Sequence, residues 1–233
     1  LKGNGAERVV ITLASGFIEA GHRASIICFK RHIELPVPKS ISVHIFSEKG
    51  FRWIPRRLRG LLTAPWLDRF IKKHAGTPDL VLSNLMPSDR ILACSKLPGV
   101  HFIIHNTTQK EVAFNNSNQQ QHELAERERL YGSKPSICVS RGVENDMREL
   151  LSQQTLPPIS TIHNPINVTE IEAAACESPD DIIPNAIICV GKFKEQKRQD
   201  RLIRAFAAIN CQEPLAFIGQ GPLLRDAKDL AKQ

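Results

Sequence analysis

Two lysines, Lys192 and Lys197, lie between an apolar run and an amphipathic one in the stretch VGKFKEQKRQDRLIRAFAAI, residues 190–209. In open α/β sheets, the loops that follow the strands bind ligands, and the N-terminus of the next helix attracts anions. Two cations at such a position would suit a diphosphate. By charge alone the lysines fit a solvated surface equally well, since Lys194 is a neighbouring cation without an assigned role.

A second candidate for phosphate binding is the glycine-containing stretch KGNGAERVV at the start of the chain. Gly3 and Gly5 would allow the backbone to approach a ligand closely, and the helix predicted after them would offer unpaired N–H groups to an anion. An ordinary glycine turn that begins a helix explains the same residues.

The elements that must position these residues alternate along the chain. Short apolar runs predict buried strands at 24–29, 41–46, 79–83, 100–105, 136–140, 159–163, 186–190 and 214–219. Helical periodicity predicts helices at 6–21, 119–132, 141–152 and 198–209. Such alternation is typical of an α/β fold with parallel sheets.

A proline-punctuated polar stretch, HNPINVTEIEAAACESPDDIIPNA, indicates a domain boundary near Pro165. We therefore expect a first domain over residues 1–164 and a second over 165–233. The second has only two predicted strands and two helices, too few to close a doubly wound sheet. In the first, no strand precedes the opening glycine stretch, so its first strand is expected to be missing.

Taken in order, these stretches resemble one family. The GAERV stretch, the strands that end at His105 and Ser140, IHNPIN, VGKFKEQK and IGQGPL are similar to those of family 4 glycosyltransferases, retaining enzymes of the GT-B fold. The resemblance implies two Rossmann-like domains, the first on the acceptor side and the second holding most of the nucleotide sugar. The sequence ends before that family's paired-glutamate motif, so we expect a truncated second domain and a fragment inactive by itself.

The resemblance also implies roles for individual residues. Lys197 matches a lysine that binds the donor diphosphate, and Lys192 stands where the family usually has arginine, which keeps the charge but loses the bidentate geometry. His105 matches a histidine near the reacting sugar and is the candidate catalytic residue; a strand-end histidine satisfied by local hydrogen bonds is the alternative. The implied donor-binding residues are Gly5, Gly191, Lys192, Lys197, Gly219 and Gly221.

The implied function is transfer of a sugar from a nucleotide diphosphate to a surface polysaccharide, lipopolysaccharide or lipid-linked acceptor, with retention of configuration. No metal and no other cofactor is expected, since no Asp-x-Asp motif is present. Two alternatives remain open. One is a non-catalytic module that binds a nucleotide or a partner; the other is a sugar phosphorylase of the same architecture, for which no pyridoxal-type lysine context is recognisable.

A basic segment at residues 51–76 interleaves aromatic and aliphatic residues with cations, a pattern that could lie on an anionic membrane. The residues expected to contact such a surface are Arg56, Arg57, Arg59, Trp66, Lys72 and Lys73. Pro55 and Pro65 are expected to begin helices here. The alternative is a pair of ordinary helices with solvated arginines.

Composition limits the kinds of partner and the cellular location that we expect for the chain. A net charge of +7 and a pI near 9.2 imply an anionic partner. Aromatic residues are sparse at 6%, and no Cys/His finger or basic tail is present, so a nucleic-acid partner is not expected. The six cysteines lack a CxxC pair and are expected to be buried thiols. Without a signal peptide or a spanning segment, the chain is expected in the cytoplasm, at most peripheral to the inner face of the cell membrane.

Overall fold

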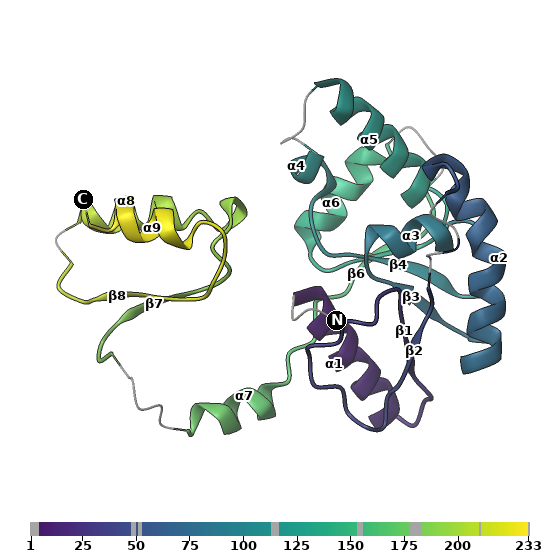
Figure 1. Ribbon diagram of the computed structural model, residues 1–233, viewed down its shortest axis with the longest axis horizontal. Coiled ribbons are helices and arrows are strands. Elements are labelled where there is room, and N and C mark those ends of the chain that lie inside the picture. The colour runs from purple at the N-terminus through teal and green to yellow at the C-terminus, as the bar shows by residue number, and fades with distance from the viewer. Residues whose placement is uncertain are drawn as a thin grey trace. The chain divides into compact units, whose positions relative to one another are not determined.

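The computed structural model describes residues 5–47, 50, 53–112, 117–152, 156–177, 183–209 and 211–232 (Figure 1). The chain divides into two compact units, Leu1–Asn167 and Val168–Gln233. Both are built from parallel strands and helices, which confirms the predicted α/β fold class.

The first unit contains two parallel sheets. A four-stranded sheet has the order β3-β4-β5-β6, with the strands Val81–Ser83, Val100–Ile104, Ser136–Cys138 and Ile159–Thr161. A separate pair consists of β1 (Ser25–Cys28) and β2 (Ser42–Ile45). Because all four strands of the larger sheet run parallel, their carboxyl ends lie along one edge.

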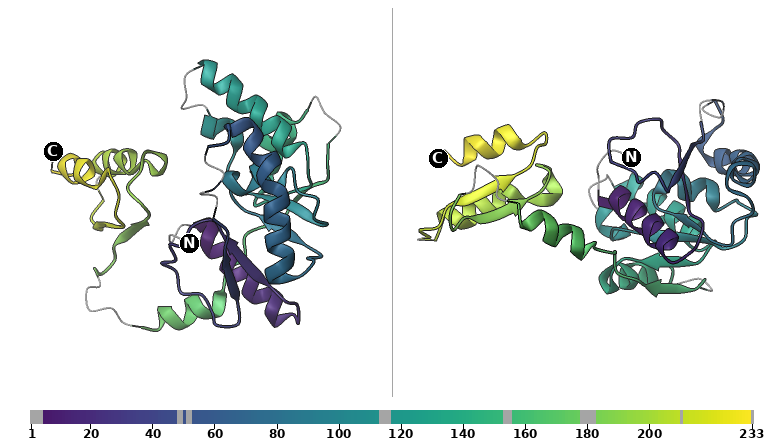
Figure 2. Two further views of the ribbon diagram at one scale, coloured as in Figure 1. Left: turned by 45° about the vertical axis from the view of Figure 1, so that its right-hand side comes forward. Right: turned by 90° about the horizontal axis from the view of Figure 1, so that it is seen from below.

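Helices flank the strands of this unit (Figures 1 and 2). They are α1 (Gly5–Glu19), α2 (Arg56–Ala75), α3 (Met86–Leu92), α4 (Thr108–Val112), α5 (Ser117–Tyr131) and α6 (Arg141–Leu150). The main core is centred on β4, β5 and α6, where Phe102, Cys138 and Met147 are fully buried. A smaller core joins α1 to the β1–β2 pair around Ala14 and Ile26.

The segment expected to contain two helix starts is one helix, so the expectation for Pro65 was wrong. Pro55 immediately precedes α2, whereas Pro65 lies inside it. A proline within a helix removes one backbone hydrogen bond and costs about 3 kcal/mol. Burial of Ala64, Leu67 and Ile71 against the core, at 1%, 1% and 6% exposure, offsets this cost and keeps the helix continuous.

The second unit contains one parallel pair, β7 (Ile187–Val190) and β8 (Leu215–Ile218). Its helices are α7 (Val168–Ala175), α8 (Gln199–Ala207) and α9 (Leu224–Leu230), with a single 3₁₀ turn at Glu195–Lys197. Helices α8 and α9 lie over one side of the strand pair (Figure 1). On the other side, Ile188, Val190 and Ile218 are 59%, 73% and 56% exposed.

The prediction of six buried thiols was wrong in part. Cys28 and Cys138 are buried, as apolar strand residues should be, but Cys94 and Cys176 are exposed because they lie at helix ends rather than in strands.

Candidate functional site

The predicted donor-binding residues of the second unit meet at the carboxyl ends of β7 and β8. Gly191 and Lys192 directly follow β7. The backbone from Gly191 to Phe193 runs beside the segment that follows β8. The Gly191 N–H donates to the Ile218 carbonyl at 2.9 Å, and the Phe193 N–H donates to the Gln220 carbonyl at 3.0 Å. The two loops therefore form one edge of the unit, which carries Lys192, Lys197, Gly219 and Gly221.

Gly219 and Gly221 are glycines because the two loops touch backbone to backbone. A Cβ atom added to Gly219 would lie 2.0 Å from the Gly191 carbonyl oxygen, and one added to Gly221 would lie 2.4 Å from the Phe193 carbonyl oxygen. Neither separation leaves room for a side chain. Loop packing thus accounts for both glycines, whether or not a nucleotide lies beside them.

The loop between β7 and α8 is fastened at its far end by Gln199. This residue is 4% exposed, and its Nε2 donates to the Lys192 carbonyl at 3.0 Å. Arg198, just before it, has φ 51° and ψ 39°, a left-handed conformation that is uncommon for residues other than glycine. The bend takes the chain from the 3₁₀ turn into the first turn of α8.

Lys197 ends the 3₁₀ turn, and its side chain passes Gly191: a Cβ atom added to that glycine would lie 3.9 Å from the Lys197 Cγ and Cδ atoms. Lys192 and Lys197 are both exposed. Together with the positive end of α8, they make this edge attractive to an anion with several negative oxygens.

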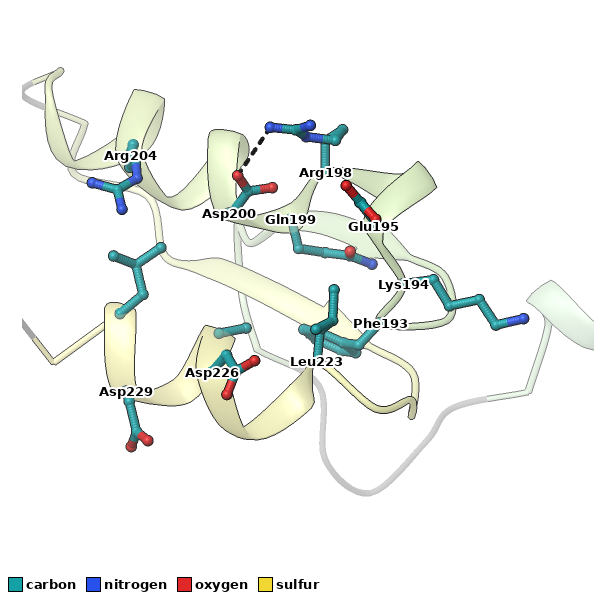
Figure 3. Close-up of a pocket in the computed structure, with 12 residues that line it drawn as sticks. Phe193, Lys194, Glu195, Arg198, Gln199, Asp200, Arg204, Leu223, Asp226 and Asp229 are labelled. Carbon is teal, nitrogen blue, oxygen red and sulfur yellow. Dashed lines mark hydrogen bonds and ion pairs between the residues drawn. The ribbon is translucent and has the colours of Figure 1, made fainter. Parts of the chain in front are cut away.

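A hollow of this unit lies elsewhere, between α8 and α9 (Figure 3). It measures about 460 Å³ and includes none of the predicted donor-binding residues. The charged side chains around it are Lys194, Glu195, Arg198, Asp200, Arg204, Asp226 and Asp229. Carboxylates outnumber cations there and Arg198 is paired with Asp200 at 3.3 Å, so the hollow suits a diphosphate less well than the edge does.

In the first unit, His105 lies just past the end of β4, at the carboxyl edge of the four-stranded sheet. Its Nε2 is 3.2 Å from the Oδ1 of Asn84, which lies just past the end of β3. Burial of the ring lowers the pKa of His105 below the usual value, so the neutral imidazole is favoured. Asn84 was not predicted from the sequence, although a polar residue directly after an apolar strand is a signal for such a position.

Behind this edge, Asp89 of α3 forms a buried polar cluster with neighbouring elements. Its carboxylate accepts hydrogen bonds from the Ser83 hydroxyl at 2.5 Å and from the Tyr131 hydroxyl at 3.3 Å. Burial at 1% exposure raises the pKa of Asp89 to about 6, against the lowering effect of these two hydrogen bonds. The cluster joins β3, α3 and α5, and so fixes the strand end that carries Asn84.

The remaining predicted residues are dispersed. Gly5 is the first residue of α1, and Gly3 before it lies outside the described residues. On α2, Trp66, Lys72 and Lys73 are exposed, whereas Arg59 is half-buried and donates to the Ile54 carbonyl at 3.1 Å. The side chains of Arg56 and Arg57 are outside the described part of the structure.

Comparison with known proteins identifies the family. The family model for "Glycosyltransferase Family 4" matches residues 3–170, well over half of the chain. This range includes Asn84 and His105 and ends before Lys192 and Lys197. No curated protein matches the chain. Among the residues that the structure describes, no helix is long and apolar enough to cross a membrane. The first unit has parallel strands with polar side chains at their carboxyl edge, and the family model covers residues 3–170. The chain therefore belongs to glycosyltransferase family 4.

Proposed function

We propose that this glycosyltransferase transfers a sugar from a nucleotide-diphosphate donor and that Lys192 and Lys197 bind the diphosphate. The observation that carries the proposal is the meeting of both lysines with Gly191 and the N-terminus of α8 at one edge. Breaking the bond between the anomeric carbon and phosphate builds negative charge on the departing nucleotide diphosphate. Cations and helix N–H groups at that position stabilise the charge more in the transition state than in the ground state.

The same reasoning leads us to propose that no metal ion is required. The two lysines and the helix N-terminus supply the positive charge that a bridging magnesium ion would otherwise supply. In a catalytically active protein that contains this chain, we expect sugar transfer to continue at an unchanged rate in EDTA. Loss of transfer in EDTA, with recovery on addition of Mg²⁺, would contradict this part of the proposal.

We further propose that configuration is retained and that the acceptor is a surface polysaccharide, lipopolysaccharide or lipid-linked glycan. Family membership supports sugar transfer in general, and the resemblance of the motifs favours retention. The experiment is to determine the anomeric configuration of the product by NMR spectroscopy. An inverted product would refute retention without refuting transfer.

Lys197→Ala tests the diphosphate site, and Lys194→Ala is the matched control because it removes the same charge from the same loop. In Figure 3 the Lys194 side chain extends away from the other labelled residues. Hydrogen bonds to charged groups contribute about 1.5–3 kcal/mol, so Lys197→Ala should weaken UDP or GDP binding by about tenfold or more. In a catalytically active protein that contains this chain, release of nucleotide from the sugar donor should fall by orders of magnitude. Equal effects of the two substitutions would refute the assignment, and nucleotide affinity without turnover in that protein would indicate a binding module.

A specific observation favours a second property, contact with an anionic membrane surface. Helix α2 has two apolar faces: Ala64, Leu67 and Ile71 are buried in the core, while another face is exposed. The exposed face carries Leu58, Leu61, Leu62 and Trp66 at 50%, 60%, 48% and 60% exposure, followed by Arg69, Lys72 and Lys73 at helical spacing. We call this set the α2 outer face. Next to it lies a hollow of about 410 Å³ lined by Gly50, Trp53, Ile54, Leu62 and Trp66.

Apolar residues followed by cations on one helix face are typical of helices that rest in a lipid interface. We propose that the α2 outer face contacts the inner leaflet, where a lipid-linked acceptor would be presented. Leu61→Glu should abolish co-sedimentation with phosphatidylglycerol vesicles, whereas Leu80→Glu, an exposed leucine outside α2, should not. Binding that does not depend on anionic lipid, or that survives Leu61→Glu, would refute this proposal.

A further inference from the structure

Two polar side chains meet where neighbouring parallel strands end. In the β3–β4 register, Ser83 is opposite Phe102, and Asn84 and His105 extend past the ends of their strands on the same edge. Both side chains are partly buried. Their contact is the 3.2 Å approach of the His105 Nε2 to the Asn84 Oδ1.

The orientation of the Asn84 amide follows from its other contact. Its Nδ2 is 3.2 Å from the Leu82 carbonyl oxygen. A carbonyl oxygen can only accept, so the NH₂ group must face Leu82 and the amide oxygen must face His105. An amide oxygen likewise only accepts. The proton in the hydrogen bond between Asn84 and His105 must therefore be on the histidine Nε2.

A neutral imidazole has one ring proton. With that proton on Nε2, the Nδ1 of His105 carries a lone pair and can only accept a hydrogen bond. Within the described part of the chain, the contact with Asn84 is the hydrogen bond that the His105 ring makes. Burial of the ring also disfavours a second proton, because it disfavours the charged form.

We propose that Asn84 is a positioning residue that fixes the His105 proton on Nε2, so that Nδ1 is presented as an acceptor for a sugar hydroxyl. This deepens the proposed function and depends on it for the identity of the ligand, since a sugar hydroxyl is the donor group that glycosyl transfer brings to this edge. A neutral histidine of this tautomer cannot donate from Nδ1 to a phosphate oxygen.

Two other histidines have the opposite arrangement and provide internal references. The Nδ1 of His101 is 3.0 Å from the Gly99 carbonyl oxygen, and the Nδ1 of His163 is 3.2 Å from the Val139 carbonyl oxygen. Each must donate from Nδ1 to make these bonds. A single NMR spectrum of the chain should therefore contain signals of both tautomers, each from a known histidine.

The test is a long-range ¹H–¹⁵N correlation spectrum of the ¹⁵N-labelled chain at about pH 8, above the ordinary histidine pKa near 6.5. His105→Gln assigns the signal. We expect His105 to be protonated on Nε2 alone, and His101 and His163 on Nδ1. Protonation of His105 on Nδ1, or an even mixture of the two tautomers, would overturn the proposal.

Two variants separate positioning from mere structural support. Asn84→Leu, similar in size but without hydrogen-bonding groups, should convert His105 to a mixture of tautomers. Asn84→Asp should retain the Nε2 proton and favour a second proton on Nδ1. A single Nε2 tautomer in Asn84→Leu would show that Asn84 is not the cause. If a variant fails to fold, the wild-type spectrum still decides where the proton lies.

The spectrum requires no substrate, so its outcome is independent of the proposed function. An unchanged nucleotide affinity in Lys197→Ala would refute the diphosphate site and leave the His105 tautomer as measured. Protonation of His105 on Nδ1, or an even mixture of tautomers, would refute the role of Asn84. It would not affect the proposed diphosphate site.

Discussion

Replacing Asp89 by asparagine should remove a pH-dependent loss of stability from the first unit. Asp89 is 1% exposed in the described structure, and burial raises its pKa from the ordinary 3.8 to about 6. Because the folded state binds this proton more tightly than the unfolded state does, the folded state is favoured when Asp89 is protonated. That stability is fully present below about pH 4 and is lost as the pH rises through 6.

The size of the effect follows from the shift. A difference of about two pKa units, at 1.36 kcal/mol per unit, corresponds to about 3 kcal/mol. Asparagine has nearly the same shape and does not ionise. Relative to Asp89→Asn, the wild-type chain should therefore lose about 3 kcal/mol of unfolding free energy between pH 4 and pH 7.

The assay is urea unfolding followed by circular dichroism at several pH values for both proteins. Asp226→Asn, on the exposed surface of α9, controls for the change in net charge. A constant difference between wild type and Asp89→Asn across this range would refute the reasoning. That result would mean that the hydrogen bonds from Ser83 and Tyr131 fully offset the desolvation cost of the buried carboxylate.

Two further substitutions test the local geometry of each unit. Gly219→Ala places a Cβ atom 2.0 Å from the Gly191 carbonyl oxygen and should destabilise the β7–β8 pair by about 2 kcal/mol or more, seen as faster hydrogen exchange of the β7 amides. Gly142→Ala, whose Cβ atom would meet an ordinary 3.8 Å contact, should not destabilise the fold, and similar losses in both would contradict the close-approach argument. Ser140→Ala removes the hydroxyl that accepts from the Val143 N–H at the start of α6 and should cost about 1 kcal/mol in urea unfolding; no loss would show that this cap is dispensable.

The strands were predictable because continuous apolar runs favour strands, and each predicted run contains an observed strand. Their predicted burial was wrong for β7, where Ile188 and Val190 are exposed. Helix faces were harder to predict. In α1, the described packing is centred on Ala14 with Val10, Ile11 and Ile18, although the apolar residues extend around much of the helix. Periodicity alone cannot choose among the faces of such a helix. In α2, proline alone predicts a helix start at Pro65. Burial of Ala64, Leu67 and Ile71 instead keeps the helix continuous through this residue.

The second unit's edge was predictable because its residues follow one another closely in a strand-loop-helix segment. Local sequence order is enough to place Gly191, Lys192 and Lys197 together. Asn84 could not be paired with His105 in this way, since 21 residues separate them and only the alignment of β3 beside β4 brings them into contact. Helix α7 was missed because it lies in a polar stretch bounded by prolines.

The exposed side of the β7–β8 pair has a consequence for how the chain behaves in a test tube. Ile188, Val190 and Ile218 form an aliphatic patch on a short parallel pair, the kind of surface that promotes aggregation. We expect self-association at high protein concentration to begin at this patch, and Val190→Lys to improve solubility. Nucleotide titrations are therefore best made on dilute samples, with light scattering as a check that the protein remains dispersed.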